Sequence, residues 1–186
     1  MQRFSRVISA LLLLAVTGGP ALAANDSTPY AGEADRAIKA LSPKDIADLL
    51  AGRGWGFAKP AELNGFPGPA HLLELKAEIG LTASQRDQIE ALFADMNAEA
   101  RTIGAQFVAA EKALDTAFAA RTIAPAALEG LIAESARLRG QLRLVHLKTH
   151  LATLPLLTHH QVKRYNRLRG YEDDGQGTEH DGKHRH

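Results

Sequence analysis

The feature that most constrains the fold is a long run of apolar residues spaced three and four positions apart. It begins after Thr82 and ends near Ala120, and its members are Ile89, Leu92, Met96, Ala100, Ile103, Phe107, Ala110, Leu114 and Phe118. This spacing places apolar side chains on one face of an α-helix. A helix of roughly 39 residues is about 58 Å long, more than a compact domain of this size needs. The pattern therefore predicts a fold organised around one long helix.

A second long helix is predicted after a four-residue link. Pro125 occupies a helix-starting position, and apolar residues then recur along one side: Leu128, Leu131, Ile132, Leu138, Leu142, Val145 and Leu154. So short a link favours antiparallel packing. Pro155 ends the pattern, and residues 158–168 predict a last helix. No segment alternates as a strand does, so we expect an all-α fold, a long antiparallel helical hairpin with short flanking helices.

Shorter elements are expected before the hairpin. Pro43 starts an amphipathic helix that ends near Gly52, and Pro69 opens another that Gly80 closes. The Gly- and Pro-rich stretch between them predicts a loop. Its aromatic residues either form an apolar binding patch or fold the loop onto the hairpin; they are Trp55, Phe57 and Phe66.

The first 23 residues have the pattern of a secretory signal peptide. Arg3 and Arg6 precede an apolar run over residues 7–16, and Ala21 and Ala23 supply small residues before a cleavage site. A membrane anchor is the alternative, but the run is about ten residues, against roughly 20 for a bilayer span. We expect a periplasmic protein that works without ATP. The expected division is a signal peptide over 1–23, an arm and short helix over 24–50, the hairpin domain over 51–171 and a disordered His- and acid-rich tail over 172–186.

Composition excludes several classes of function. There is no Cys, which excludes disulfides and thiolate chemistry. A formal net charge of +1 and 5% aromatic residues argue against nucleic acid as a partner. The chain contains no motif of the phosphate-binding, zinc-protease or serine-hydrolase kind. We therefore expect no enzyme activity and no required cofactor.

One short pattern, LTxxQ, occurs at two predicted helix starts. The residues are Leu81, Thr82 and Gln85 in the first copy and Leu157, Thr158 and Gln161 in the second. In a capping box the Thr hydroxyl accepts a backbone N–H three residues on, and the Gln side chain reaches back to the Thr N–H. Each copy is expected to stabilise its helix by about 1 kcal/mol.

Two such motifs around a predicted hairpin in an exported chain resemble the Spy/CpxP-like LTxxQ family of periplasmic proteins. The resemblance covers residues 51–171, and the family's relatives include the CnrX- and ZraP-type metal sensors. It implies a cradle-like antiparallel homodimer that binds unfolded or misfolded envelope proteins, or that senses envelope stress or metals with a two-component sensor as partner. The second motif departs from the family pattern by containing His159 and His160.

Basic residues dominate the second half of the hairpin. Between Ala124 and Gly170 there are eight basic residues and only two acidic ones. We expect a client-binding basic face that attracts acidic chains, formed by Arg137, Arg139, Arg143, Lys148, Arg164 and Arg167. The alternative is a solvated face whose charges pair with acidic residues of the first long helix.

Histidine spacing favours a second function. His146 and His150 are four residues apart on one predicted helix face, where they could chelate one divalent ion such as Zn, Ni, Co or Cu, with His71 as a third ligand. The alternative for these residues is packing. The sequence thus predicts an ATP-independent, chaperone-like or envelope-stress protein, with a heavy-metal sensor or resistance protein as the alternative.

Overall fold

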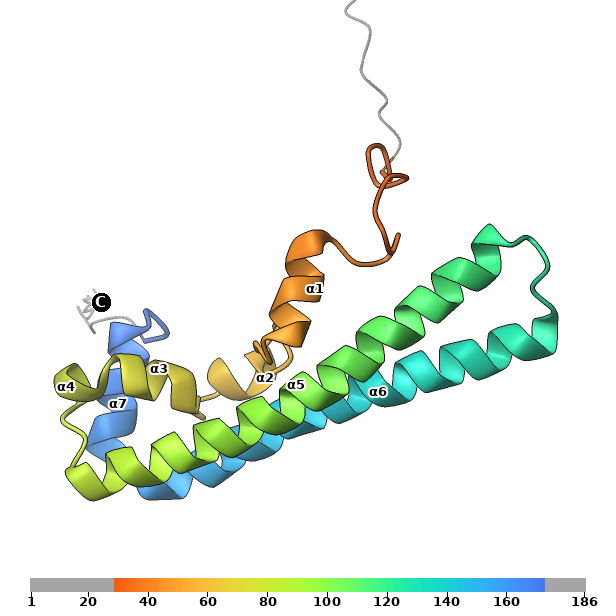
Figure 1. The fold of residues 1–186 in the computed structure, drawn as a ribbon. Helices are drawn as coiled ribbons and strands as arrows, with labels where there is room; N and C mark the ends of the chain where they lie inside the picture. The colour runs from red at the N-terminus through yellow and green to blue at the C-terminus, as the bar shows by residue number, and fades with distance from the viewer. Residues whose placement is uncertain (1–28, 173–186) are drawn as a thin grey trace, which may run out of the picture. The chain divides into compact units, whose positions relative to one another are not determined.

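The structure, a computed structural model, describes residues 29–172, and within them it contains helices and connecting segments but no β-strand (Figure 1). The prediction of an all-α fold is therefore confirmed for this part of the chain. The predicted signal peptide, and the tail from residue 173 on, lie outside the described residues. None of the described helices combines the length and apolar character that a bilayer crossing requires.

Two long helices form the centre of the fold. α5 (Ala83–Ala119) and α6 (Pro125–Thr153) lie side by side and are joined by residues 120–124 (Figure 1). After α6 a 3₁₀ turn, η1 (Leu154–Leu156), contains Pro155, and α7 (His159–Leu168) follows. The buried apolar positions of the two periodic runs lie from Ile89 to Phe107 in α5 and from Leu138 to Val145 in α6.

The first short helix, α1 (Pro43–Leu50), packs on α5. Leu49 is buried in this contact, and a Cβ on Gly104 of α5 would collide with the Leu49 carbonyl oxygen, so the close approach requires glycine. The expected domain boundary after residue 50 is therefore not seen. α1 belongs to the same compact unit as α5, and that unit begins at Glu33.

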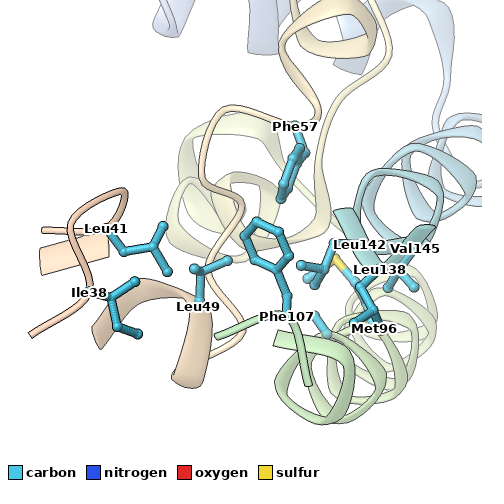
Figure 2. Close-up of a cluster of buried hydrophobic side chains, with 10 residues drawn as sticks. Ile38, Leu41, Leu49, Phe57, Met96, Phe107, Leu138, Leu142 and Val145 are labelled. Carbon is cyan, nitrogen blue, oxygen red and sulfur yellow. The ribbon is translucent and has the colours of Figure 1, made fainter. Parts of the chain in front are cut away.

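Helices α1, α5 and α6 share one apolar cluster with the segment that follows α1. Figure 2 shows Phe107 of α5 with Leu49 on one side, Leu142 of α6 on the other and Phe57 above it. The buried members are Ile38, Leu41, Leu49, Phe57, Met96, Ala100, Phe107, Leu138, Leu142 and Val145. Phe57 therefore packs in the core. This agrees with the alternative in which the loop aromatics fold the loop onto the long helices.

The segment between α1 and α5 is more helical than its Gly and Pro content suggests. It contains α2 (Lys59–Glu62), because Pro60 lies in the first turn, where a missing N–H costs nothing. The helix expected from Pro69 to Gly80 is divided into α3 (Pro69–Glu74) and α4 (Lys76–Ile79). Gly80 ends α4 with a φ of 73°, as a helix-closing glycine does.

The break between α3 and α4 has a packing cause. The backbone at Leu75 has φ −101° and ψ 19°, outside the helical region. Leu73 and Leu75 would lie about 160° apart on one straight helix, yet both contact the same apolar cluster. Its buried members are Leu72, Ile79, Ile89 and Tyr165, and the motif residues Leu81 and Leu157 pack at its edge. Tertiary packing therefore overrides local helical continuity here.

Both predicted capping boxes are present, and they bond to each other. The hydroxyls of Thr82 and Thr158 accept the N–H groups of Gln85 and Gln161, and each Gln Oε1 accepts its own Thr N–H at 2.9 Å. In addition, Nε2 of each glutamine donates to Oε1 of the other at 2.9 Å. Two helix starts that are 76 residues apart are thereby joined by a reciprocal pair of amide hydrogen bonds.

The glutamine pair also holds the segments that precede the two helices. Gln85 Nε2 donates to the Leu156 carbonyl at 2.7 Å, and Gln161 Nε2 donates to the Gly80 carbonyl at 3.1 Å. Every amide hydrogen of the pair therefore has an acceptor inside the protein. A partly buried amide network of this kind stabilises the fold only while it remains complete.

Gln85→Ala and Gln161→Ala each remove the reciprocal amide hydrogen bonds that join the two glutamines. We expect each substitution to lower the free energy of unfolding by about 2 kcal/mol, and the double variant to lose clearly less than the sum of the two. Urea unfolding followed by circular dichroism measures these values. Gln88→Ala, an exposed glutamine of α5, is the control and should change stability by less than about 0.5 kcal/mol. Additive losses would show that the two motifs act independently.

Candidate functional site

A cavity of about 680 Å³ lies where α5 and α6 meet the segments on either side of α2 and the end of α7. Its wall is mainly apolar and includes Trp55, Leu63, Phe93 and Met96. A cavity of this size is typical of ligand-binding sites. All three histidines that the sequence singled out, His71, His146 and His150, line it.

His150 has a fixed orientation. Its Nδ1 lies 2.7 Å from the Phe66 carbonyl oxygen, which can only accept, so Nδ1 holds the proton and Nε2 has a free lone pair in the neutral ring. A Cβ on Gly68 would lie 2.8 Å from this Nε2, so glycine is required beside the ring. The Glu62 carboxylate is 3.8 Å from Nδ1.

His146 is buried against residues 55–57, which contain Trp55 and Phe57 and which we call the aromatic segment. Its ring stacks on Phe57 with 6.2 Å between centroids, and its Nε2 has no hydrogen-bond partner among the described residues. Burial, and next the neighbouring charge of His150, lowers the pKa of His146 below its ordinary value of 6.5. The ring is therefore neutral at pH 7, and its buried Nε2 is unpaired.

His71 is placed differently from the other two. Its ring is partly exposed, and its Nδ1 bonds to Glu74 of the same helix at 2.8 Å. In residues 29–172 no three His, Asp or Glu side chains are arranged to hold one metal ion. The structure thus brings the three predicted histidines to one cavity without assembling them into a metal centre, and the metal site stays a prediction.

Glu62 is a centre of polar contacts that the sequence did not single out. Its carboxylate accepts hydrogen bonds from the hydroxyls of Tyr165 and Tyr171, and Arg169 lies 3.5 Å away. Burial, and next the bond to Glu62, raises the pKa of Tyr165. Because Tyr165 follows Glu62 by 103 residues, no local pattern could have revealed the pair. The contact fixes α2 to α7 beside the cavity.

The predicted basic face is less continuous than its sequence implies. Arg137 pairs with Glu134 and Lys148 pairs with Glu99 of α5, each at 2.7 Å, so two of its six charges are neutralised. The Arg139 guanidinium lies 5.5 Å from the Trp55 ring centroid. Of the six predicted cations, those without an acidic partner in the part of the chain that the structure describes are Arg139, Arg143, Arg164 and Arg167.

The far half of the helix pair has no buried residue. From Val108 in α5 through the link to Glu134 in α6, all of which is described, every side chain is exposed or only partly covered. Phe118 is 53% exposed and Ile132 is 49% exposed, although both belong to the predicted apolar stripes. The partly covered apolar residues beside them are Leu114, Leu128 and Leu131. We call this region, residues 108–134, the far half, and we call the remainder of α5 and α6 the near half.

No protein-family model, no curated protein and no solved structure matches this chain. The resemblance to the LTxxQ family therefore rests on the two motifs and their placement, and it stays a prediction.

The lowered pKa of His146 predicts an acid-sensitive fold. A buried ring with a depressed pKa contributes stability that is complete above pH 6.5 and is lost as the pH falls through the folded-state pKa. Between about pH 7 and pH 5, the free energy of unfolding should fall more steeply in the wild type than in His146→Gln. Urea unfolding in buffer with a chelator measures both slopes. His160→Gln, an exposed control on α7, should keep the wild-type slope, and identical slopes in all three proteins would refute the prediction.

Proposed function

We propose that this protein binds exposed segments of unfolded or misfolded polypeptides in the periplasm, without ATP, as a chaperone-like envelope-stress protein. The observation that supports this most directly is the far half of the helix pair. Its apolar stripes lack the cover that α1 and the aromatic segment give to the near half.

The energetics suit reversible binding. Complete burial of a Phe or Ile side chain contributes about 1.5–3 kcal/mol, and Phe118 and Ile132 each have about half of that still to gain. A handful of such residues gives modest affinity for any apolar segment. Release then needs no nucleotide, as a compartment without ATP demands.

Positive charge would guide acidic segments toward the protein. Arg143 on α6 and Arg164 and Arg167 on α7 are exposed and have no acidic partner among the described residues. Such charges raise encounter rates with acidic chains, and salt weakens the effect. The basic face therefore contributes through these cations rather than through all six that the sequence suggested.

A homodimer is part of this proposal. Two helices can cover only one stripe of each other, so a second copy would cover part of the remaining apolar surface in a self-complementary contact and leave Phe118 and Ile132 free for a client. Secretion through the predicted signal peptide and a two-component sensor as a further partner belong to the same proposal.

Replacing both exposed apolar residues of the far half tests the proposed function. We expect Phe118→Gln with Ile132→Gln to keep the wild-type circular dichroism spectrum and to remain folded at the assay temperature, with a melting temperature only a few degrees lower, because both side chains are only half covered. Light scattering of a reduced, aggregating client should show at least a threefold loss of suppression at equal concentration.

Leu168→Gln is the matched control, since Leu168 is 45% exposed on α7 and lies outside the far half. It should suppress aggregation as the wild type does. Full activity of the double variant, or inactivity of the wild type at every salt concentration, would contradict the proposal.

A periplasmic heavy-metal sensor or buffer is the second candidate. The observation in its favour is that three histidines line one cavity and that His150 has its Nδ1 bonded to a carbonyl, which leaves Nε2 free as in many metal-bound histidines.

Calorimetric titration of Zn, Ni, Co and Cu into a shortened chain distinguishes metal binding in the histidine cavity from metal binding by the His-rich tail. The chain should end at Glu172, because Tyr171 bonds to Glu62 and Asn166 bonds to Glu172. A specific site predicts one equivalent of metal in this chain and at least tenfold weaker binding in His150→Gln. Absence of measurable affinity in the shortened chain would reject the site.

A further inference from the structure

A second cleft, separate from the histidine cavity, lies on the other side of the aromatic segment. It has a volume of about 580 Å³ and is formed by residues 55–60 and by one face of α6. Three cations line it, Lys59, Arg139 and Arg143, and no acidic residue does. None of the three makes an ion pair within residues 29–172.

The aromatic wall of this cleft is held in place by several contacts. Trp55 has a φ of 42°, a left-handed conformation that costs a bulky residue free energy. Its indole Nε1 donates to Asp45 at 2.7 Å, and its ring contacts Phe57 edge-on at 5.3 Å between centroids. The Arg139 guanidinium lies over the same ring. A strained residue fixed by contacts on each side forms a preorganised wall.

The lining favours one kind of anion. Guanidinium groups recognise planar oxyanions through paired N–H donors. Phosphate sites add backbone N–H groups from a helix N-terminus or hydroxyl side chains. This cleft contains no Ser or Thr, and its α6 residues lie in the middle of the helix. The start of α2 does line the cleft, but α2 has four residues, and Pro60 in its first turn has no N–H. Trp55, Pro60 and Ala136 supply apolar surface beside the charges.

We propose that this cleft is a binding site for small organic acids, which place a carboxylate between Arg139, Arg143 and Lys59 and an aromatic or aliphatic body against Trp55. The volume of the cleft lies within the range of small-molecule sites, and it is larger than a carboxylate group alone would fill. The proposal is independent of apolar polypeptide binding by residues 108–134, although Arg143 belongs both to the cleft and to the basic face.

The sole tryptophan of the chain lies in the cleft wall, so its fluorescence reports occupancy directly. Calorimetry on the mature full-length protein measures affinity for phenylacetate, acetate, benzyl alcohol and inorganic phosphate. We expect phenylacetate to bind at least tenfold more tightly than each of the other three and to change the Trp55 emission. Equal or tighter binding of phosphate, or no binding of phenylacetate, overturns the proposal.

Glycines of α6 provide matched variants. Gly140 lines the cleft, and a Cβ there meets no atom within 4 Å, so Gly140→Glu puts a carboxylate into the cleft without disturbing the core. Gly130→Glu makes the same change at an equally open position outside the cleft. We expect phenylacetate affinity to fall at least tenfold in the first variant and to stay within twofold of wild type in the second. Equal effects in both would overturn the proposal.

Loss of one cation gives a second, independent readout. Arg143→Gln should weaken phenylacetate binding at least fivefold and should flatten its salt dependence, while Arg164→Gln, an unpaired arginine of α7, should leave both unchanged. Unaltered binding in Arg143→Gln contradicts a carboxylate site at this position. Aggregation suppression should be the same in the wild type and Gly140→Glu. A negative result for ligand binding in the cleft is therefore distinguishable from a negative result for the proposed polypeptide binding.

Discussion

A pair of helices can bury only one stripe of each partner, and the rest of this structure depends on that limit. In the near half, further elements supply the missing cover: α1 packs on α5 with Leu49, and the aromatic segment adds Phe57. The segment before α1 reaches the far half through the Lys39 N–H, which donates to Asp115, but no side chain of the far half is buried. The near half therefore has a core, whereas the far half has an apolar surface.

The two LTxxQ motifs determine how the near half is closed. Each motif begins a helix, and the reciprocal amide bonds between Gln85 and Gln161 join the start of α5 to the start of α7. Glu62 then ties α2 to α7 through Tyr165. These bonds connect segments that are distant in sequence, and they fix the walls of the histidine cavity. Stability is thus concentrated at one end of the helix pair and apolar exposure at the other.

Much of the fold could be predicted from local patterns. The periodic runs located α5 and α6 to within a few residues, and the Pro and Thr positions located the helix starts, because capping and periodicity are properties of neighbouring residues. The break at Leu75 and the position of α1 on α5 were not predictable in this way. Both follow from contacts with residues far along the chain, such as the close approach of Leu49 to Gly104.

The candidate sites could likewise be predicted from the sequence only in part. Spacing alone placed His146 and His150 on one helix face, but it could not show that Phe66 would orient one ring and Phe57 would cover the other. Counting charges likewise predicted the basic face and left open whether acidic residues of the first long helix would pair with it; Glu99 pairs with Lys148 alone. The cleft beside Trp55 had no sequence pattern, since Lys59 and Arg143 meet only after α6 packs against the aromatic segment.

The proposed function requires that the uncovered far half binds polypeptide. Hydrogen–deuterium exchange of the protein, with and without a reduced and unfolded client, measures this binding residue by residue. We expect the client to slow amide exchange in residues 108–134 and to leave the amides of the buried cluster around Phe107 and Leu142 unchanged. Slower exchange confined to other parts of the chain, or no change with a client whose aggregation the protein suppresses, would contradict it.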